Sequence, residues 1–286
     1  KVSVSDITAD YSRVAKGDLS GIAEASGIVL ENAGGKYDIG TIRLNSRSAD
    51  RDNEIILSSA IADGSFKGTG PIGTFVKDIL SLTSEKELPA LFGEPEEGRQ
   101  GNAYSVDLNI LDSRNLLAFF APGAYLADST AVRMDITEEG AMKARISSQR
   151  IAFKEKYLKD LSIDLNNDDS ALNCNLKSGE LRLTPSIVLK NNSLVLYAND
   201  NTIGLGYNFD NASSVENRGE FYMTGNVSES APGSPVINAS TLTSNISING
   251  ENWDLQPAEF RYSKDGLKMQ GVRVSNGDQV ASVDGG

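Results

Sequence analysis

Few residues in this sequence are of the types that carry enzyme chemistry. Histidine is absent from all 286 residues, which excludes Ser-His-Asp and Cys-His catalysis and histidine-ligated zinc. The single cysteine, Cys174, can form neither an internal disulfide nor a thiolate zinc cluster. We therefore expect a protein that is not an enzyme, with no catalytic residues, no metal ligands and no cofactor.

Three motifs have the composition of ligand-binding loops but lack the context. Residues 68–73, Gly-Thr-Gly-Pro-Ile-Gly, have the spacing of a dinucleotide-binding fingerprint, but that fingerprint needs a parallel βαβ unit and the neighbouring segments alternate as antiparallel strands do. The Asn- and Asp-rich runs 166–169 and 199–201 offer the oxygen ligands that calcium prefers. Neither completes the calcium-loop spacing, and Asn and Asp are typical of hairpin turns. The sequence therefore predicts turns at all three places.

The charge balance limits the possible partners. The chain has 27 Lys and Arg against 39 Asp and Glu, a formal net charge of -12. An acidic chain lacks the basic footprint that phosphate backbones attract, so no nucleic-acid partner is expected. The sequence also contains no run of 18 apolar residues, the length that predicts a membrane-spanning helix.

The elements that must position any site are strands. Apolar and polar residues alternate in many segments, for example 106–110, 132–136 and 161–165. This period of two predicts strands with one apolar and one polar face. Turn residues separate the strands at intervals of about 8–14 residues, as in an antiparallel meander. The sequence predicts a mainly β fold, either a curled antiparallel sheet of the trough or β-taco type or a β-sandwich.

Two segments have helical rather than strand periodicity. In Pro71–Leu82 the apolar residues are spaced by three and four, and Ser113–Phe120 has an N-cap followed by an apolar body. We expect both short helices to pack against the sheet. The proline-bearing acidic segment Ser84–Asn102 is expected to be an exposed loop. It suggests a division into an N-terminal β segment, 1–100, with the first helix and the acidic loop, and a β-rich trough segment, 101–286, although one continuous domain is equally compatible.

A sheet with one apolar face must cover that face with a second layer, by curling or with a ligand. A curled sheet that holds lipid acyl chains suits the alternating pattern, since each buried CH₂ contributes about 0.8 kcal/mol. A dry sandwich core built from the same residues is the alternative. The residues predicted to line a lipid groove are Leu161, Ile163, Leu165, Leu181, Leu183, Leu194, Leu196, Ile246 and Ile248.

The order of strands and turns in the C-terminal part of the chain resembles a known family. The segments are Ile248–Leu255 (Ile-Asn-Gly-Glu-Asn-Trp-Asp-Leu), Tyr262–Leu267, Val274–Val280 and Val283–Gly285. They are similar to the TamB-like branch of the AsmA-like family. The paired segments Leu19–Asn32 and Tyr37–Ser46, then Ile55–Ser59, Phe66–Gly68 and the helix from Pro71, extend the resemblance over most of the chain.

The resemblance implies an interior, periplasmic segment of a long cell-envelope protein, a translocation and assembly module that is anchored in the inner membrane. Members of this family have a curled β-sheet whose apolar inner face is thought to guide phospholipid between the inner and outer membranes. TamB relatives also have an outer-membrane barrel-assembly protein as partner and serve protein secretion and outer-membrane biogenesis. The family has no catalytic residues. The expected function is therefore passive lipid transport, assistance in outer-membrane protein assembly, or both, with phospholipid acyl chains as ligand.

Two other functions stay open on the sequence. The chain could be an assembly scaffold that offers strand edges to nascent outer-membrane proteins by β-augmentation. It could also be an exported carbohydrate-binding or adhesive β-domain, for which a shallow aromatic platform would be the characteristic feature.

Overall fold

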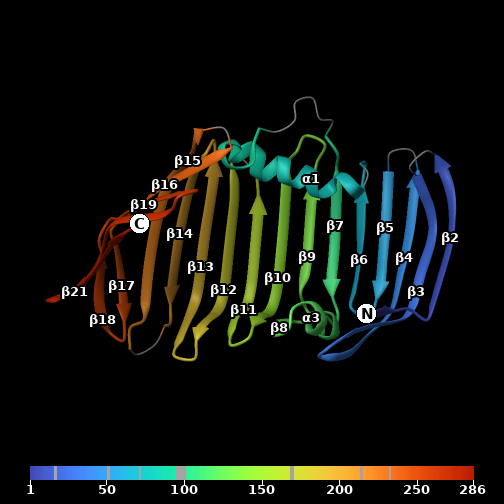
Figure 1. Ribbon diagram of the computed structural model, residues 1–286, viewed down its shortest axis with the longest axis horizontal. Coiled ribbons are helices and arrows are strands. Elements are labelled where there is room, and N and C mark those ends of the chain that lie inside the picture. The colour runs from blue at the N-terminus through green and yellow to red at the C-terminus, as the bar shows by residue number, and fades with distance from the viewer. Residues whose placement is uncertain are drawn as a thin grey trace. The chain divides into compact units, whose positions relative to one another are not determined.

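Alternation of apolar and polar residues produces strands along almost the whole chain (Figure 1). The computed structural model describes residues 1–15, 18–49, 52–70, 72–94, 101–167, 171–212, 215–231 and 233–286. Within these ranges, 21 strands form one antiparallel sheet that is interrupted by three short α-helices. The predicted mainly β, antiparallel fold class is confirmed, with one more helix than the two that the sequence predicted.

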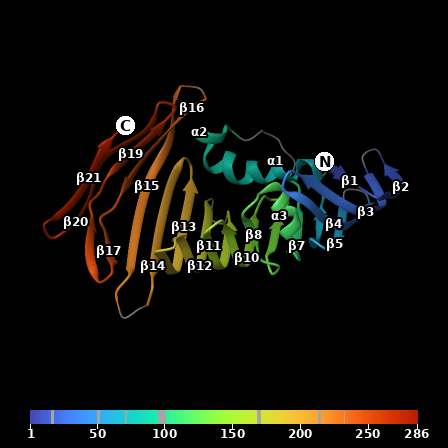
Figure 2. The ribbon, with the colours of Figure 1, turned by 60° about the horizontal axis from the view of Figure 1, so that its bottom comes forward.

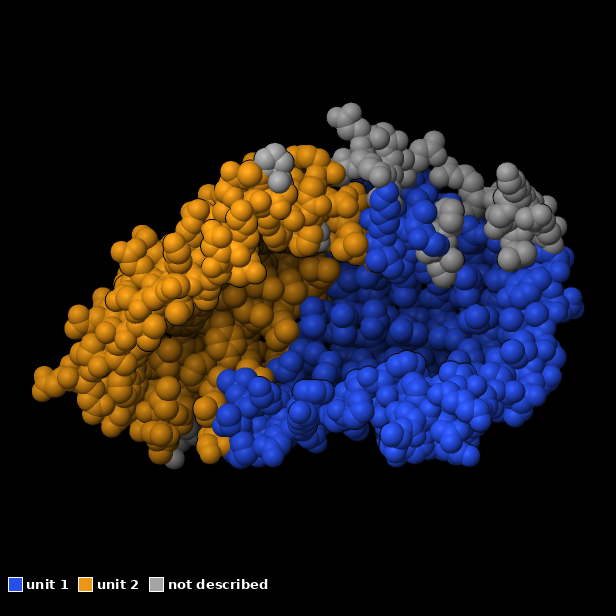
Figure 3. Space-filling view, in the orientation of Figure 1, with its two compact units in different colours: residues 1–78, 100–163, 182–185 blue, residues 79–99, 164–181, 186–286 orange. Residues whose placement is uncertain are grey.

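The chain divides into two compact units that interleave along the sequence, coloured blue and orange in Figure 3. Unit 1 comprises residues 1–78, 100–163 and 182–185, and unit 2 comprises residues 79–99, 164–181 and 186–286. The division that the sequence suggested, between residues 1–100 and 101–286, falls next to residues 95–100, which lie outside the described residues, and it stays a prediction.

Unit 1 is built from the first ten strands in hairpin order. These are β1 (Val2–Ser3), β2 (Asp6–Ala15), β3 (Asp18–Asn32), β4 (Gly35–Ala49), β5 (Asp52–Ser59), β6 (Ala62–Gly68), β7 (Tyr104–Ile110), β8 (Ala124–Leu126), β9 (Ala131–Ile136) and β10 (Met142–Phe153). From β2 to β7 each strand pairs with the next, β9 then pairs with β7, and β10 pairs with both β9 and the short β8. Strands β11 (Lys156–Asn166) and β12 (Leu172–Thr184) contribute residues to both units.

Unit 2 continues with β13 (Ile187–Asn199), β14 (Thr202–Asp210), β15 (Arg218–Ala231), β16 (Ser234–Thr241), β17 (Ser244–Ile248), β18 (Glu251–Leu255), β19 (Glu259–Ser263), β20 (Gly266–Asn276) and β21 (Gln279–Gly285). Beyond β15 the pairing forks, because β16 pairs with residues 223–231 of β15 and β17 pairs with residues 218–219 at its start. Both branches rejoin at β20 through β19 and β18, and β21 pairs with β20 (Figure 2).

The helices lie where helical periodicity predicted them. A 3₁₀ turn (Ile72–Thr74) leads into α1 (Phe75–Leu80), and α3 spans Arg114–Phe120. The expectation of an exposed loop from Ser84 is wrong for its first part. A π-helical turn (Ser81–Glu85) and α2 (Pro89–Phe92) occupy it, while residues 95–100 lie outside the described residues.

The helical turns around α2 form because unit 2 provides hydrogen bonds for their backbone. The Asn201 side-chain oxygen accepts a hydrogen bond from Ala90 N at 2.9 Å, and Asn201 N donates to the Glu87 carbonyl at 2.8 Å. The Asn201 carbonyl in turn accepts from Val227 N at 2.7 Å, which ties these turns to β15. Such long-range contacts are invisible in local composition, and they override the loop tendency of the segment.

Candidate functional site: an open apolar sheet face

Strand register places the aliphatic residues of unit 1 in continuous rows on one face. Residues directly opposite each other on paired strands share a face of the sheet. One row runs through Leu44, Leu57, Gly64, Leu108, Val132 and Ile146. The next row runs through Ser46, Ile55, Phe66, Val106, Met134 and Ala144. Together these rows form what we call the apolar face of unit 1.

The opposite face is polar and carries charges of alternating sign. Its clearest row is Arg47, Glu54, Lys67, Ser105, Asp135 and Lys143. Lys67 Nζ and Glu54 Oε1 are 3.1 Å apart, as are Arg133 Nε and Asp107 Oδ2 in the neighbouring row. Cross-strand pairs of opposite charge favour this register. They also keep this face in water, so the apolar rows must be covered or exposed on their own side.

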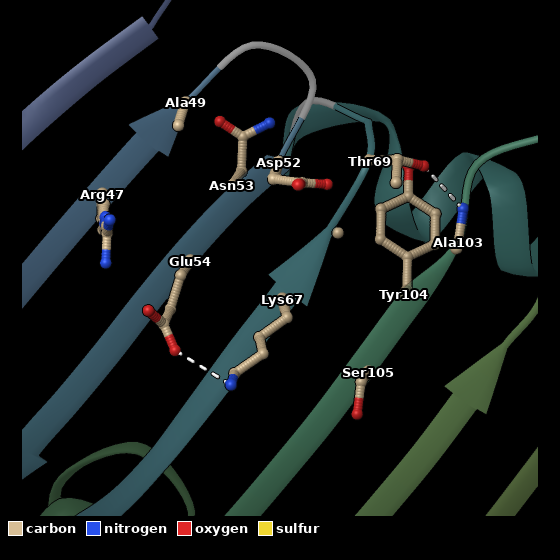
Figure 4. Close-up of a pocket in the computed structure, with 11 residues that line it drawn as sticks. Arg47, Ala49, Asp52, Asn53, Glu54, Lys67, Thr69, Ala103, Tyr104 and Ser105 are labelled. Atoms are coloured by element: carbon tan, nitrogen blue, oxygen red, sulfur yellow. Dashed lines mark hydrogen bonds and ion pairs between the residues drawn. The ribbon is translucent and has the colours of Figure 1, made fainter.

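A depression of about 460 Å³ lies on that charged face, over β4 to β7 (Figure 4). Arg47, Glu54 and Lys67 point into it, and the Lys67–Glu54 ion pair lies across its floor. Its one aromatic residue, Tyr104, is only 2% exposed. A flat sugar face therefore has no open ring to stack on here, and two of its charged groups, Lys67 and Glu54, already pair with each other.

One end of the apolar face is closed by α1. The rings of Phe66, Phe75 and Tyr104 meet with centroid separations of 5.1–5.7 Å. Tyr104 belongs to a third row, and its neighbours in that row, Ile136 and Met142, are also buried. Aromatic packing of this kind fixes the first turn of α1 over the sheet.

A buried polar network beneath α1 holds this cover in place. Asp78 is buried and accepts hydrogen bonds from Tyr104 Oη, from Asn102 Nδ2 at 2.9 Å and from Thr74 Oγ1 at 3.3 Å. Burial, and then the hydrogen bond to the Asp78 carboxylate, raise the pKa of Tyr104 above its usual value of 10.0. The sequence predicted an apolar helix face made partly of Val76 and Leu80. Both are exposed, because the carboxylate of Asp78 takes the inward position instead.

The other end of the apolar face is bordered by α3, which packs against β4, β8 and β3 (Figure 2). Phe119 meets Tyr37 edge to face at a centroid distance of 6.0 Å. Asn115 Nδ2 donates to the Asp38 carbonyl at 2.7 Å. Between α1 and α3 the surface of unit 1 is hollowed over β6, β7 and β9 (Figure 3).

The floor of this hollow is not dry. Every aliphatic side chain at the centre of the two rows is partly exposed, namely Ile55, Leu57, Val106, Leu108, Val132, Met134 and Ile146. The only large side chain that is fully buried among the described residues is Met142. Aliphatic residues of a dry core would be almost fully buried. The apolar face of unit 1 is therefore an open apolar surface.

Unit 2 repeats the pattern with its own register. Leu194 pairs with Tyr207 and then Phe221, and Leu196 pairs with Leu205 and then Met223. Leu194, Leu205, Tyr207, Phe221 and Met223 are partly exposed, and Leu196 is exposed. Unit 2 therefore has a second apolar face of the same kind.

The nine residues that the sequence predicted as groove lining differ in their surroundings. Leu194 and Leu196 lie on the apolar face of unit 2, and Ile246 lies opposite Trp253 and near Phe209. Leu161 is buried, whereas Ile163, Leu165 and Leu181 are partly exposed, and Leu183 and Ile248 are exposed. Leu161 and Ile163 belong to unit 1, as does Leu183, and the other six belong to unit 2.

The rows of β5, β7, β9 and β10 were missed as lining residues, although the sequence had predicted strands at 106–110 and 132–136. The signal was available in the alternation itself, but nothing local says which apolar face stays open. That depends on where the helices lie across the sheet, which only the tertiary structure defines.

Two other kinds of feature to consider in the described residues are metal sites and membrane-spanning helices. No group of three or more acidic or cysteine side chains able to hold a metal ion occurs in the described ranges. No helix in the described part of the chain is long and apolar enough to cross a membrane. Comparison with family models, with curated proteins and with solved structures gave no match to this chain.

Proposed function

We propose that this chain is a non-enzymatic lipid-guiding segment whose apolar faces bind phospholipid acyl chains. The observation that carries the proposal is the two rows of unit 1, which are continuous, aliphatic and partly exposed. An acyl chain laid along them removes aliphatic surface from water on both partners, which contributes about 0.8 kcal/mol per buried CH₂. The charged opposite face keeps the segment soluble.

The setting of the proposal follows from the TamB-like resemblance. In that setting the chain is a periplasmic segment of a parent protein anchored in the inner membrane, and its lipids pass between the inner and outer membranes. Assistance to outer-membrane protein assembly, through an outer-membrane barrel-assembly partner, belongs to the same proposal. The apolar rows support the lipid part, and the resemblance supports the rest.

A photo-crosslinking amino acid on each face tests the lipid part directly. Placed at Leu108 on the apolar face, the crosslinker is expected to capture phospholipid when the chain is produced in the periplasm of a Gram-negative cell. Placed at Ile56, which lies on the charged face of β5 and is 43% exposed, the crosslinker should capture none. Equal lipid capture at both positions, or none at Leu108, would refute the proposal.

One observation favours the alternative of a carbohydrate-binding β-domain. On the face of unit 2 opposite its apolar face, the Tyr222 ring lies over Gly206, close enough that a Cβ on Gly206 would be 3.3 Å from it. Tyr222 and the nearby Tyr197 are both 41% exposed, and exposed aromatic rings can stack on sugars. Glycan binding that is lost in Tyr222→Ala and kept in Leu108→Ala would support this function over lipid guiding.

The scaffold alternative would use the strand edge of β21. All seven residues of β21 are exposed, and within the described residues β21 pairs only with β20. An open edge can add a strand from another chain. Capture of unfolded outer-membrane proteins by the chain, with no bound lipid, would favour this function.

A further inference from the structure

The hairpin of β10 and β11 carries a positive charge that the rest of the chain opposes. Residues 143–159 contain six basic residues and one acidic residue, a net charge of +5 in a chain of -12. A two-residue turn at Lys154 and Glu155 joins the strands, with Lys154 at a φ of 55°. Neither the apolar faces nor the lipid-guiding function accounts for this concentration of charge.

Three of the cations in this region converge on one aromatic ring. The Arg150 guanidinium carbon lies 4.7 Å from the centre of the Tyr157 ring, Lys159 Nζ lies 4.9 Å from it, and the Arg182 guanidinium carbon lies 5.8 Å from it. All these residues belong to unit 1, and they come from β10, β11 and β12. Like charges around one ring repel one another, and an anion bound beside the ring would reduce that repulsion.

Arg150 is held by two rings at once. Its guanidinium carbon is also 5.8 Å from the centre of the Tyr125 ring on β8, which pairs with β10. The quadrupole of an aromatic ring attracts a cation over its face. The two tyrosines therefore hold Arg150 in place, while oxygen ligands are the partners that its N–H donors prefer.

Arg182 supplies a donor that lacks an acceptor. Its Nε atom is buried and has no hydrogen-bond partner in the part of the chain that the structure describes. Neither Arg150 nor Arg182 forms an ion pair with any described carboxylate. By contrast, Arg43 is paired with Glu24, Arg133 with Asp107 and Arg218 with Glu216. Buried donors are normally satisfied, so the Arg182 Nε–H is available to an oxygen ligand.

We propose that Arg150 and Arg182, framed by Tyr125 and Tyr157, form a binding site for a tetrahedral oxyanion of the phosphate type. The ligand is a phosphate group, carried either by a lipid headgroup or by a soluble molecule. Guanidinium groups suit it because they bind two oxygens at once. The site is defined by charge and ring geometry, so it does not depend on the lipid-guiding function of the apolar faces.

The first test is a titration of the full chain with inorganic phosphate, followed by NMR of the arginine Nε–H signals, with sodium chloride at matched ionic strength as reference. We expect phosphate, but not chloride, to shift the Arg150 and Arg182 signals. The variant Arg150→Gln/Arg182→Gln should lose at least tenfold in affinity. The matched control, Arg43→Gln/Arg133→Gln, removes the same two charges from paired positions and should bind as the parent does. No shift in the parent chain, or an equal loss in the control, overturns the proposal.

Two conservative variants separate a binding role from a structural one. Arg150→Lys/Arg182→Lys keeps the charge and removes the bidentate donors, so it should fold and still bind phosphate several-fold more weakly. Tyr157→Phe keeps the ring and should bind normally. Binding by the lysine variant that equals the parent's would mean that net charge alone is responsible, and it would overturn the proposed geometry.

The source of the phosphate group follows from a second arm with vesicles. The chain is mixed with vesicles and sedimented. If it sediments with vesicles of phosphatidylcholine that contain phosphatidylglycerol, but not with pure phosphatidylcholine, and if Arg150→Gln/Arg182→Gln loses this binding, the result supports the site and identifies a lipid headgroup. Phosphate binding without vesicle binding supports the site and identifies a soluble phosphate. Because Leu108 lies outside this site, lipid capture at Leu108 reports on the lipid-guiding function separately.

Discussion

The openness of the apolar face predicts how much its leucines matter for stability and for lipid. Leu57 and Leu108 are opposite Gly64 from its two sides, in the middle of one row. Both are partly exposed, so each substitution to serine should lower the free energy of unfolding by only about 1 kcal/mol, half of the value for a fully buried leucine. In a dry core the same changes would cost about 2–5 kcal/mol each.

The effect on lipid binding should be of similar size to the effect on stability. If each leucine buries the equivalent of one CH₂ of an acyl chain, Leu57→Ser/Leu108→Ser loses about 1.6 kcal/mol, or about 15-fold in affinity. Displacement of a fluorescent fatty-acid probe measures the affinity, and urea denaturation measures the stability. The matched control is Ile56→Ser, which removes an aliphatic side chain from the polar face of β5.

Two results would refute this reasoning. A loss of more than about 4 kcal/mol in the double variant would show that the rows are a dry core. Unchanged probe affinity in a folded double variant, or equal weakening by Ile56→Ser, would show that the lipid does not bind along this row.

Three further predictions concern the groups that hold the site together. Gly64→Ala should lower the free energy of unfolding by about 1–3 kcal/mol, because an added Cβ would be 2.3 Å from the Asp107 carbonyl oxygen. Gly73→Ala should be close to neutral, because nothing lies within 4 Å of the added Cβ, and urea denaturation compares the two variants. Because the pKa of Tyr104 is raised, its stabilising contribution is complete below pH 10 and is lost as the pH rises through its folded-state pKa. The tyrosinate absorbance of the parent minus that of Tyr104→Phe should therefore show a transition above pH 10. A transition at or below pH 10 would contradict the burial of Tyr104. Hydrogen bonds from Arg114 lower the pKa of Asp112 from 3.8 to about 2. The stabilising contribution of this pair is therefore complete above pH 3.8 and is lost as the pH falls through about 2. Carboxyl NMR should show the pKa of Asp112 return towards 3.8 in Arg114→Gln, and no change would contradict the pairing.

The strands were predictable because alternation is a local property. Segments such as 106–110 and 132–136 carry it in their own residues. Their pairing with each other is not local, because α3 and β8 lie between them in the chain. The helix from Pro71 was also predictable from its spacing. Its inward face was not, because Asp78 is buried only through partners that come from elsewhere, such as Tyr104.

The candidate sites depend on contacts between distant segments, which limits what the sequence could predict. Leu57 and Leu108 are 51 residues apart in the sequence and lie in the same row only because of the register of β5, β6 and β7. Arg150 and Arg182 are brought to one ring by three different strands. The negative net charge of -12 conceals such a local basic cluster, because it is summed over the whole chain.

The central claim, that the apolar faces hold acyl chains, is tested most directly by native mass spectrometry of the chain purified from a Gram-negative envelope without detergent, followed by solvent extraction. The account predicts co-purifying phospholipid in the parent chain and in Ile56→Ser, and its loss in folded Leu57→Ser/Leu108→Ser. A parent chain that is free of phospholipid in repeated preparations, or a double variant that retains it, would contradict the account.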